Sequence, residues 1–232
     1  MLRPELGQLT QRIARLPLDA RGYPVPWFVQ WINGAPEFRV MDGEKFARAI
    51  RERRCWVCGD VLGRHLAFVI GPMCALNKTS AEPPSHHDCA VWSAQHCPFL
   101  SRPHMVRRED ELTDTCTKGD AAIMRNPGAC GVWTTTAYRL HRSPGNSATG
   151  YLIEMGDPDR VEWFAAGRPA TRAEVEASID SGLPLLLEAV DRESGLSDRA
   201  AARLALVERR AAIDVLLPTA SDGRVQEATP HV

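Results

Sequence analysis

Three cysteines and one histidine in the first half of the chain have the types and the spacing of metal ligands. Two residues separate Cys55 from Cys58 in the run Cys-Trp-Val-Cys-Gly, and His86 and Cys89 have the same i, i+3 spacing. Thiolate and imidazole donors in a set of four are what zinc prefers in a tetrahedral site. The sequence therefore predicts one zinc ion, and four protein ligands leave no position for an activated water, which favours a structural role.

Neighbouring residues leave the identity of the fourth ligand open. His87 adjoins His86, and Cys74 precedes the pair in the sequence, so either one is an alternative to His86. Cys97 is a poorer candidate because it lies about 12 Å of helical rise beyond Cys89. The competing interpretation is a set of reduced, partly buried thiols beside a hydrogen-bonded histidine.

The segments around these residues must bring two distant pairs together. Residues 66–70 are apolar and predict a strand, and Gly71-Pro72 ends it before a second strand of a small hairpin. Ser85 is a candidate N-cap for a helix over residues 86–97, which Pro98 ends. The Cys-x-x-Cys turn at residues 55–58, called the knuckle below, predicts a treble-clef-like module over residues 42–108 together with the hairpin and the helix. A loop-rich zinc ribbon is the alternative.

Residues 1–41 predict a helix followed by a hairpin. Leu6, Leu9, Ile13 and Leu16 fall on one face of a helix over residues 5–16. Asn33-Gly34 separates an apolar run over residues 25–32 from residues 38–40, as in a hairpin with a primed turn. Asp42 is then a candidate N-cap for a helix over residues 43–53.

The C-terminal part, residues 119–217, predicts a small antiparallel sheet followed by helices. Strand candidates cover residues 129–141, 150–155 and 160–164, with Trp133 and Trp163 in their core. Thr171 and Glu174 form a capping box for a helix to about residue 181, where Gly182 and Pro184 interrupt it. A last helix opens at Ser197 with an apolar stripe made of Ala201, Leu204, Val207, Ala211, Val215 and the neighbouring Ile213 and Leu216.

The fold class expected from these elements is α+β. Residues 107–118 are polar and charged, which indicates a linker between the two halves, and residues 218–232 are typical of a disordered tail. The apolar fraction of 44% and the charged fraction of 25% are those of an ordinary globular protein.

Cysteine usage and hydropathy predict a cytoplasmic protein without a membrane span. The chain has seven cysteines and no segment typical of a secretion signal, so reduced thiols and metal ligation are favoured over disulfides. No apolar run approaches the length of about 18 residues that a membrane span needs.

Basic residues gather around the predicted zinc module, although the net charge of the chain is only −1. Residues 45–108 contain ten Lys or Arg against four Asp or Glu, but the next six residues add four acids. The asymmetry favours nucleic-acid contact, with a solvated helix face as the alternative. The expected partner is a nucleic acid or another protein. Trp56 and Trp92 are expected in a small core more than as stacking surfaces.

The usual catalytic motifs are absent, including those of zinc deaminases, metalloproteases, phosphate loops and nucleophile elbows. We therefore assign no catalytic residue. The alternative function is a metal-dependent nuclease on a treble clef, with His87, His86 or His104 as general base.

Four strings carry a resemblance to a family of uncharacterised proteins from bacteria and their phages. They are Cys-Trp-Val-Cys-Gly, Gly-Pro-Met-Cys, Pro-Pro-Ser-His-His-Asp-Cys and Cys-Pro-Phe-Leu, in that order. The resemblance spans roughly residues 24 to 190. It implies no activity or fold, and supports only the existence of a cysteine-rich module.

Overall fold

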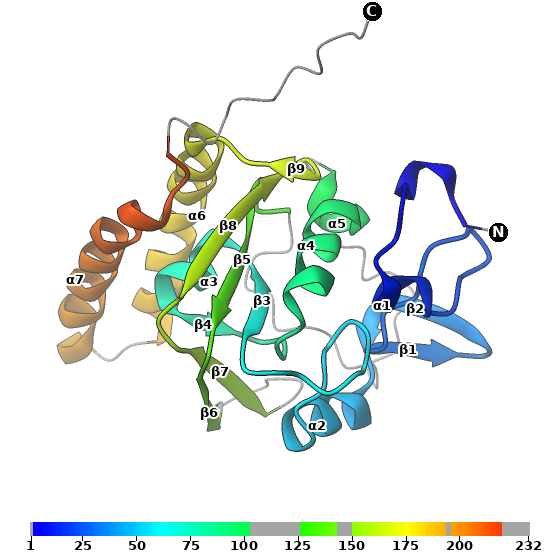
Figure 1. Ribbon diagram of the computed structural model, residues 1–232. Coiled ribbons are helices and arrows are strands. Elements are labelled where there is room, and N and C mark those ends of the chain that lie inside the picture. Colours follow the sequence, from blue (N-terminus) through cyan, green and yellow to red (C-terminus); the bar gives the residue numbers. More distant parts are fainter. Residues whose placement is uncertain (1, 103–125, 143–149, 194–195, 220–232) are drawn as a thin grey trace, which may run out of the picture.

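Two small antiparallel sheets occupy the middle of the molecule, with helices around them (Figure 1). The computed structural model describes residues 2–102, 126–142, 150–193 and 196–219. The larger sheet has the strand order β3 (Leu66–Ile70), β5 (Cys130–Thr135), β8 (Arg160–Ala165) and β9 (Arg168–Pro169). The smaller sheet has the order β4 (Thr79–Ser80), β7 (Tyr151–Met155) and β6 (Tyr138–Arg142). Antiparallel sheets together with separate helices confirm the α+β class.

Helices cover both faces of the larger sheet (Figure 1). Helix α4 (His87–His96), followed by α5 (Pro98–Ser101), packs on one face, where its Ala90 and Ala94 cluster with Ala67 and Val132 of the sheet. Helices α3 (Pro72–Asn77), α6 (Arg172–Glu193) and α7 (Leu196–Ala212) lie on the other side. Successive residues of a strand point to opposite faces, so both faces of β3 and β5 are buried.

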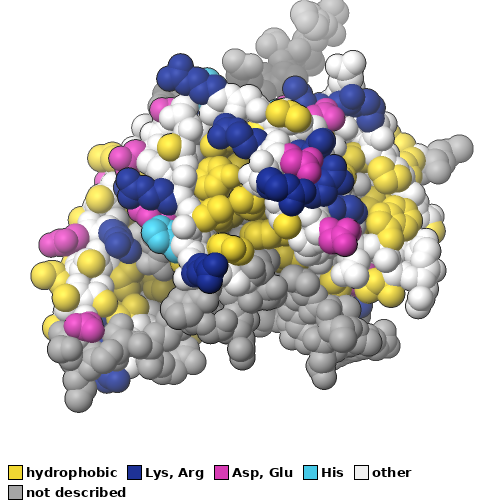
Figure 2. Space-filling model, turned by 90° about the horizontal axis from the view of Figure 1, so that it is seen from below, with side chains coloured by type: hydrophobic (Ala, Val, Ile, Leu, Met, Phe, Trp, Pro, Cys, Tyr) yellow, Lys and Arg dark blue, Asp and Glu magenta, His cyan; other side chains and the backbone are white. Residues whose placement is uncertain are grey.

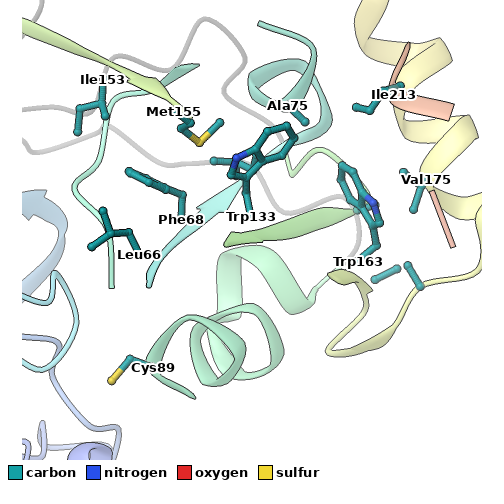
Figure 3. Packing of buried hydrophobic residues seen from close by; sticks show 14 of the residues in the cluster. Leu66, Phe68, Ala75, Cys89, Trp133, Ile153, Met155, Trp163, Val175 and Ile213 are labelled. Atoms are coloured by element: carbon teal, nitrogen blue, oxygen red, sulfur yellow. The ribbon is translucent and has the colours of Figure 1, made fainter. Parts of the chain in front are cut away.

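The larger core forms on the side of α3 and α6 (Figure 3). Trp133 and Trp163 are both buried there, as predicted. Each indole N–H has a partner, since Trp133 Nε1 donates to the Gly156 carbonyl at 3.0 Å and Trp163 Nε1 to the Leu216 carbonyl at 2.8 Å. A buried tryptophan with a satisfied N–H adds apolar area without a desolvation penalty.

The N-terminal hairpin is confirmed and the N-terminal helix is divided. Strands β1 (Val29–Ile32) and β2 (Ala35–Met41) pair through a turn in which Asn33 and Gly34 both have positive φ, as a primed turn requires. The expected helix over residues 5–16 is wrong as a single element. A 3-10 turn η1 (Pro4–Leu6) ends at Gly7, and α1 (Gln11–Ala14) follows, although Leu6 and Ile13 are buried as expected.

Helix α2 (Gly43–Arg51) begins as predicted, because the Asp42 carboxylate accepts from the amides of Glu44 and Lys45. The hairpin expected after residue 70 is wrong. Pro72 stands at the first turn of α3, where its missing N–H removes no hydrogen bond, so Gly71-Pro72 starts a helix there. Helix α3 packs against α6, a long-range contact that the local sequence does not encode.

The C-terminal elements differ from the prediction at three places. The strand expected over residues 129–141 is two strands, β5 and β6, which belong to different sheets. Helix α6 continues through Gly182 and Pro184 to residue 193, so these residues do not interrupt it. Most of the predicted stripe faces outward, with Leu204 60% and Val207 61% exposed, whereas Ile213 is buried as expected and so is Leu206, which lies outside the stripe.

Strand pairing connects the two segments, 42–108 and 119–217, that the sequence predicts as separate units. Strand β3 lies in residues 42–108 and β5 in residues 119–217, yet they pair in register from Leu66↔Thr135 to Ile70↔Gly131. Their residues also share one core cluster. The linker at residues 107–118 lies outside the described residues, as does most of the tail at 218–232.

Candidate metal centre

Cys55, Cys58, His86 and Cys89 come together at one point, as the sequence predicts. Their ligand atoms all lie within 4.8 Å of one another, and Cys58 Sγ is 3.4 Å from His86 Nδ1. A tetrahedral ion with metal–sulfur bonds of about 2.3 Å has ligand atoms about 3.8 Å apart, so these separations fit a common cation. The donor set of three thiols and an imidazole is positioned to hold a metal ion.

A tight turn presents the first two cysteines. The Gly59 amide donates to the Cys55 carbonyl at 2.9 Å, and the Cys55 amide donates to the Asp60 carbonyl at 2.7 Å. Gly59 has φ +78°, and a Cβ there would lie 2.8 Å from the Trp27 ring. Only glycine fits this position, because the turn needs a left-handed residue and the indole covers it.

Backbone amides point at the Cys55 sulfur. The amides of Cys58 and His86 both donate to Cys55 Sγ at 3.4 Å. Such bonds stabilise thiolate charge, which a metal-binding cysteine carries. One of these amides belongs to the Cys55–Cys58 turn, and the other comes from the start of α4.

His86 is oriented by its second nitrogen. Nε2 lies 3.2 Å from the Val61 carbonyl oxygen, which can only accept a hydrogen bond. The proton must therefore be on Nε2, and this leaves the lone pair of Nδ1 facing the sulfurs. A ring nitrogen held by a carbonyl is the usual second contact of a metal-binding histidine. The sequence does not indicate this contact, because a backbone carbonyl has no residue signature.

Pairing with β3 positions the other two ligands. Ser85 and Ala67 exchange backbone hydrogen bonds of 2.7 and 2.9 Å, which set the chain beside β3 just before α4 begins. The expected Ser85 cap is wrong, since His86 is the N-cap residue and makes no side-chain cap bond. Cys89 lies in the first turn of α4, away from the aromatic part of the core (Figure 3).

Helix α1 connects the two halves of the centre. Arg12 Nη1 donates to the Asp88 carboxylate at 3.0 Å, and Arg15 Nη2 donates to Asp60 at 2.5 Å. One acid adjoins Cys89 and the other follows the knuckle, so one short helix bridges both ligand-bearing segments. In the sequence, this bridge is indicated only by two arginines spaced i, i+3 with the buried Ile13 between them. That pattern does not indicate which acids the arginines contact.

The thiols affect each other's ionisation. Burial raises the pKa of Cys55, but hydrogen bonds from Cys58, Cys89 and His86 outweigh it and leave that pKa well below its ordinary value. The hydrogen bond to Cys55 raises the pKa of Cys58 to about 12 and raises that of Cys89 as well. The negative charge of one thiolate therefore disfavours ionisation of the next thiol. A bound divalent cation offsets this repulsion between thiolates.

The alternative ligands lie elsewhere among the described residues. Cys74 is in α3, and burial raises the pKa of its thiol. His87 points to Glu162 on β8 and is hydrogen-bonded to that carboxylate. Cys97 and Cys130 are outside the cluster, while His104 and Cys116 lie outside the described residues. Trp56 and Trp92 are buried, so they belong to the core as expected.

No protein-family model, curated protein or solved structure matches this chain. Within the described ranges, no helix combines the length and the apolar character needed to cross a membrane. The interpretation of the centre therefore rests on its own geometry.

Proposed function

We propose that this protein binds one zinc ion at Cys55, Cys58, His86 and Cys89, and that the ion supports a binding surface for nucleic acid or a protein partner. The observation that carries this proposal is the cluster of four ligand atoms within 4.8 Å, with His86 oriented by Val61. Three sulfurs and one nitrogen in a tetrahedral arrangement favour zinc among the common divalent ions.

A structural role follows from the number of ligands. Four protein donors complete a tetrahedron and leave no open position for water or substrate. The ion would join the knuckle before β3 to the first turn of α4, which supports the treble-clef-like arrangement of knuckle and helix. The hairpin of that arrangement is replaced here, since β3 pairs with β5.

Zinc content tests the proposal. Protein purified without added metal should contain one zinc per chain, and Cys55→Ser or Cys89→Ser should lose it. Cys74→Ala is the matched control, because Cys74 is not in the cluster, and it should keep the metal. Cobalt substitution should give the visible absorption of a tetrahedral thiolate site. A metal-free wild type, or a Cys74→Ala variant that loses zinc, would contradict the assignment.

One observation keeps the nuclease alternative in view. His87 is held by the Glu162 carboxylate, which also accepts from Arg160 at 2.6 Å, and a carboxylate-oriented imidazole is suited to proton transfer. His86 is already engaged on both nitrogens. A hydrolytic ion would need ligands other than the four at the centre. Cleavage of DNA or RNA with added Mg²⁺ or Mn²⁺, lost in His87→Ala, would support this alternative, and no cleavage with any metal would reject it.

A further inference from the structure

The hairpin of β6 and β7 carries an apolar face from the core out to solvent. Residues that pair across the two strands share a face, so Tyr138, Leu140 and Tyr151 point the same way as the buried Ile153 and Met155. Tyr138 packs edge-on against Phe68, whereas Leu140 is 40% and Tyr151 39% exposed. The apolar face therefore continues beyond the part that the core covers.

Basic residues stand on both sides of this face. On strand β6, Arg142 pairs with Tyr151 and lies on this face, whereas Arg139 and His141 point to the opposite face, where His141 is ion-paired with Glu154 at 2.6 Å. On the other side, residues 48–64 at the end of α2 and in the knuckle contain five arginines against two acids, Glu52 and Asp60. Burial raises the pKa of Tyr138, and the positive charge of Arg53 partly opposes the increase.

Figure 2 shows the surface from below, the side on which β6, β7 and α2 lie in Figure 1. A hydrophobic area lies between two groups of Lys and Arg side chains, and the acidic side chains among them are fewer. Glu52 is shared by Arg48, Arg51 and Arg54, so one carboxylate faces three guanidinium groups. The surface is apolar at its centre and positive at its two rims.

We propose that this face binds single-stranded nucleic acid, with bases on Tyr138, Leu140 and Tyr151 and phosphates at Arg53 and Arg142. A positive groove with aromatic and apolar residues at its floor is how single strands are bound without sequence readout. A duplex would offer its phosphates to the rims but keep its bases stacked inside, and the exposed apolar floor would stay uncovered.

The proposal rests on the proposed function, because the metal centre holds one rim. Arg53 and Arg54 directly precede Cys55, and the Leu62 amide donates to the Arg53 carbonyl at 2.7 Å across the knuckle. Arg53 also donates from Nη2 to the Gly63 carbonyl at 3.2 Å, which fixes its side chain beside the knuckle. Zinc would therefore fix the position of this rim.

Fluorescence anisotropy with labelled 12-nucleotide single strands of DNA and RNA tests the proposal on the full zinc-loaded chain. Affinity should fall linearly with salt on logarithmic axes, with a slope of about −0.7 for each phosphate contact. Arg142→Glu and Arg53→Gln should each weaken binding by about tenfold and make the slope shallower. Tyr151→Ser should weaken binding at an unchanged slope, because it removes stacking only. Arg209→Glu, an exposed change on α7, is the matched control and should have no effect.

Several outcomes overturn the proposal. A folded chain with one zinc that binds no single strand rejects it and leaves the structural metal intact. If Arg209→Glu weakens single-strand binding as much as Arg142→Glu does, the attraction is non-specific. If a duplex binds more tightly than the single strands and Tyr151→Ser does not change the affinity, the surface contacts phosphates only. Capture of an acidic protein in place of the oligonucleotides also rejects it. Full binding by a chain without zinc leaves this face in place and refutes the structural role of the ion.

Discussion

His86 and His87 are neighbours in sequence with different environments. The Nδ1 of His86 faces the sulfurs, whereas His87 points to Glu162. We expect His86→Ala to lower zinc affinity by about 100-fold or more, since even second contacts of ligands are worth 10- to 100-fold. His86→Cys should retain zinc in a four-thiolate site.

Competition with a chromophoric chelator measures these affinities. His87→Ala is the control, and its zinc affinity should equal that of the wild type. If His87→Ala lost zinc while His86→Ala kept it, the ligand assignment would move to His87, the alternative that adjacency leaves open.

Gly59 combines a left-handed backbone with close contact to Trp27. Gly59→Ala should lower the free energy of unfolding by about 2–4 kcal/mol, the sum of backbone strain and overpacking. Gly34→Ala is the control, because its φ of +79° is similar but a Cβ there meets nothing within 4 Å, so backbone strain is its only cost. Urea unfolding of the zinc-loaded protein measures both. Equal effects would show that the Trp27 contact contributes nothing.

Most ligand positions can be predicted from the sequence, because the spacings of Cys55 and Cys58 and of His86 and Cys89 are local patterns with direct chemistry. The contacts that orient them could not be. The Val61 carbonyl has no residue signature, and the partners of Arg12 and Arg15 are 76 and 45 residues away.

Among the elements, helix α7 buries a residue that lies outside the predicted apolar stripe. Leu206 is 3% exposed and Leu204 is 60% exposed, so Leu206→Ala should cost about 2–5 kcal/mol. Leu204→Ala should stay within about 0.5 kcal/mol of the wild type. Thermal or urea unfolding compares the two, and a larger loss for Leu204→Ala would mean that the outer face is covered by something.

Helix α6 begins with a capping box whose charge depends on pH. A hydrogen bond from Arg168, with others from Thr171, lowers the pKa of Glu174 from 4.5 to about 2. A folded-state pKa below the ordinary value means that the carboxylate stabilises the fold above pH 4.5, and that this contribution disappears as the pH falls from 4.5 toward 2.

Glu174→Gln should therefore be less stable than the wild type near neutral pH, and the difference should shrink as the pH falls through this window. Urea unfolding at a series of pH values measures the difference, and metal loss in acid affects both proteins alike. A difference that stays constant with pH would show that the charge of Glu174 is unimportant.

Sequence patterns predicted elements well where the signal is local and poorly where distant packing decides. The Asn33-Gly34 turn, the Asp42 cap and the capping box at Thr171 all hold. Helix α3 packs against α6, which continues through Pro184. No periodicity within one segment reports such a contact.

For the whole molecule, the metal and the hydrophobic core should contribute to different regions. The cluster around Trp133 and Trp163 includes Cys55 and Cys89, but Cys89 lies apart from both tryptophans (Figure 3), and the ligands join the knuckle to the start of α4. Chelation of zinc should therefore speed amide exchange at residues 55–62 by about tenfold or more and leave β5 protected. Hydrogen exchange followed by mass spectrometry measures this. Uniform loss of protection would show that the ion supports the entire fold.

The register of β3 against β5 also constrains how the polypeptide is made. More than half of the chain must leave the ribosome before residues 130–135 reach residues 66–70. Until then one edge of the apolar strand β3 is bridged to Ser85 and its other edge is open. An open apolar edge attracts other chains. The cysteine-rich segment is thus incomplete as an excised fragment, even with its cation bound, because a neighbour synthesised much later completes its sheet.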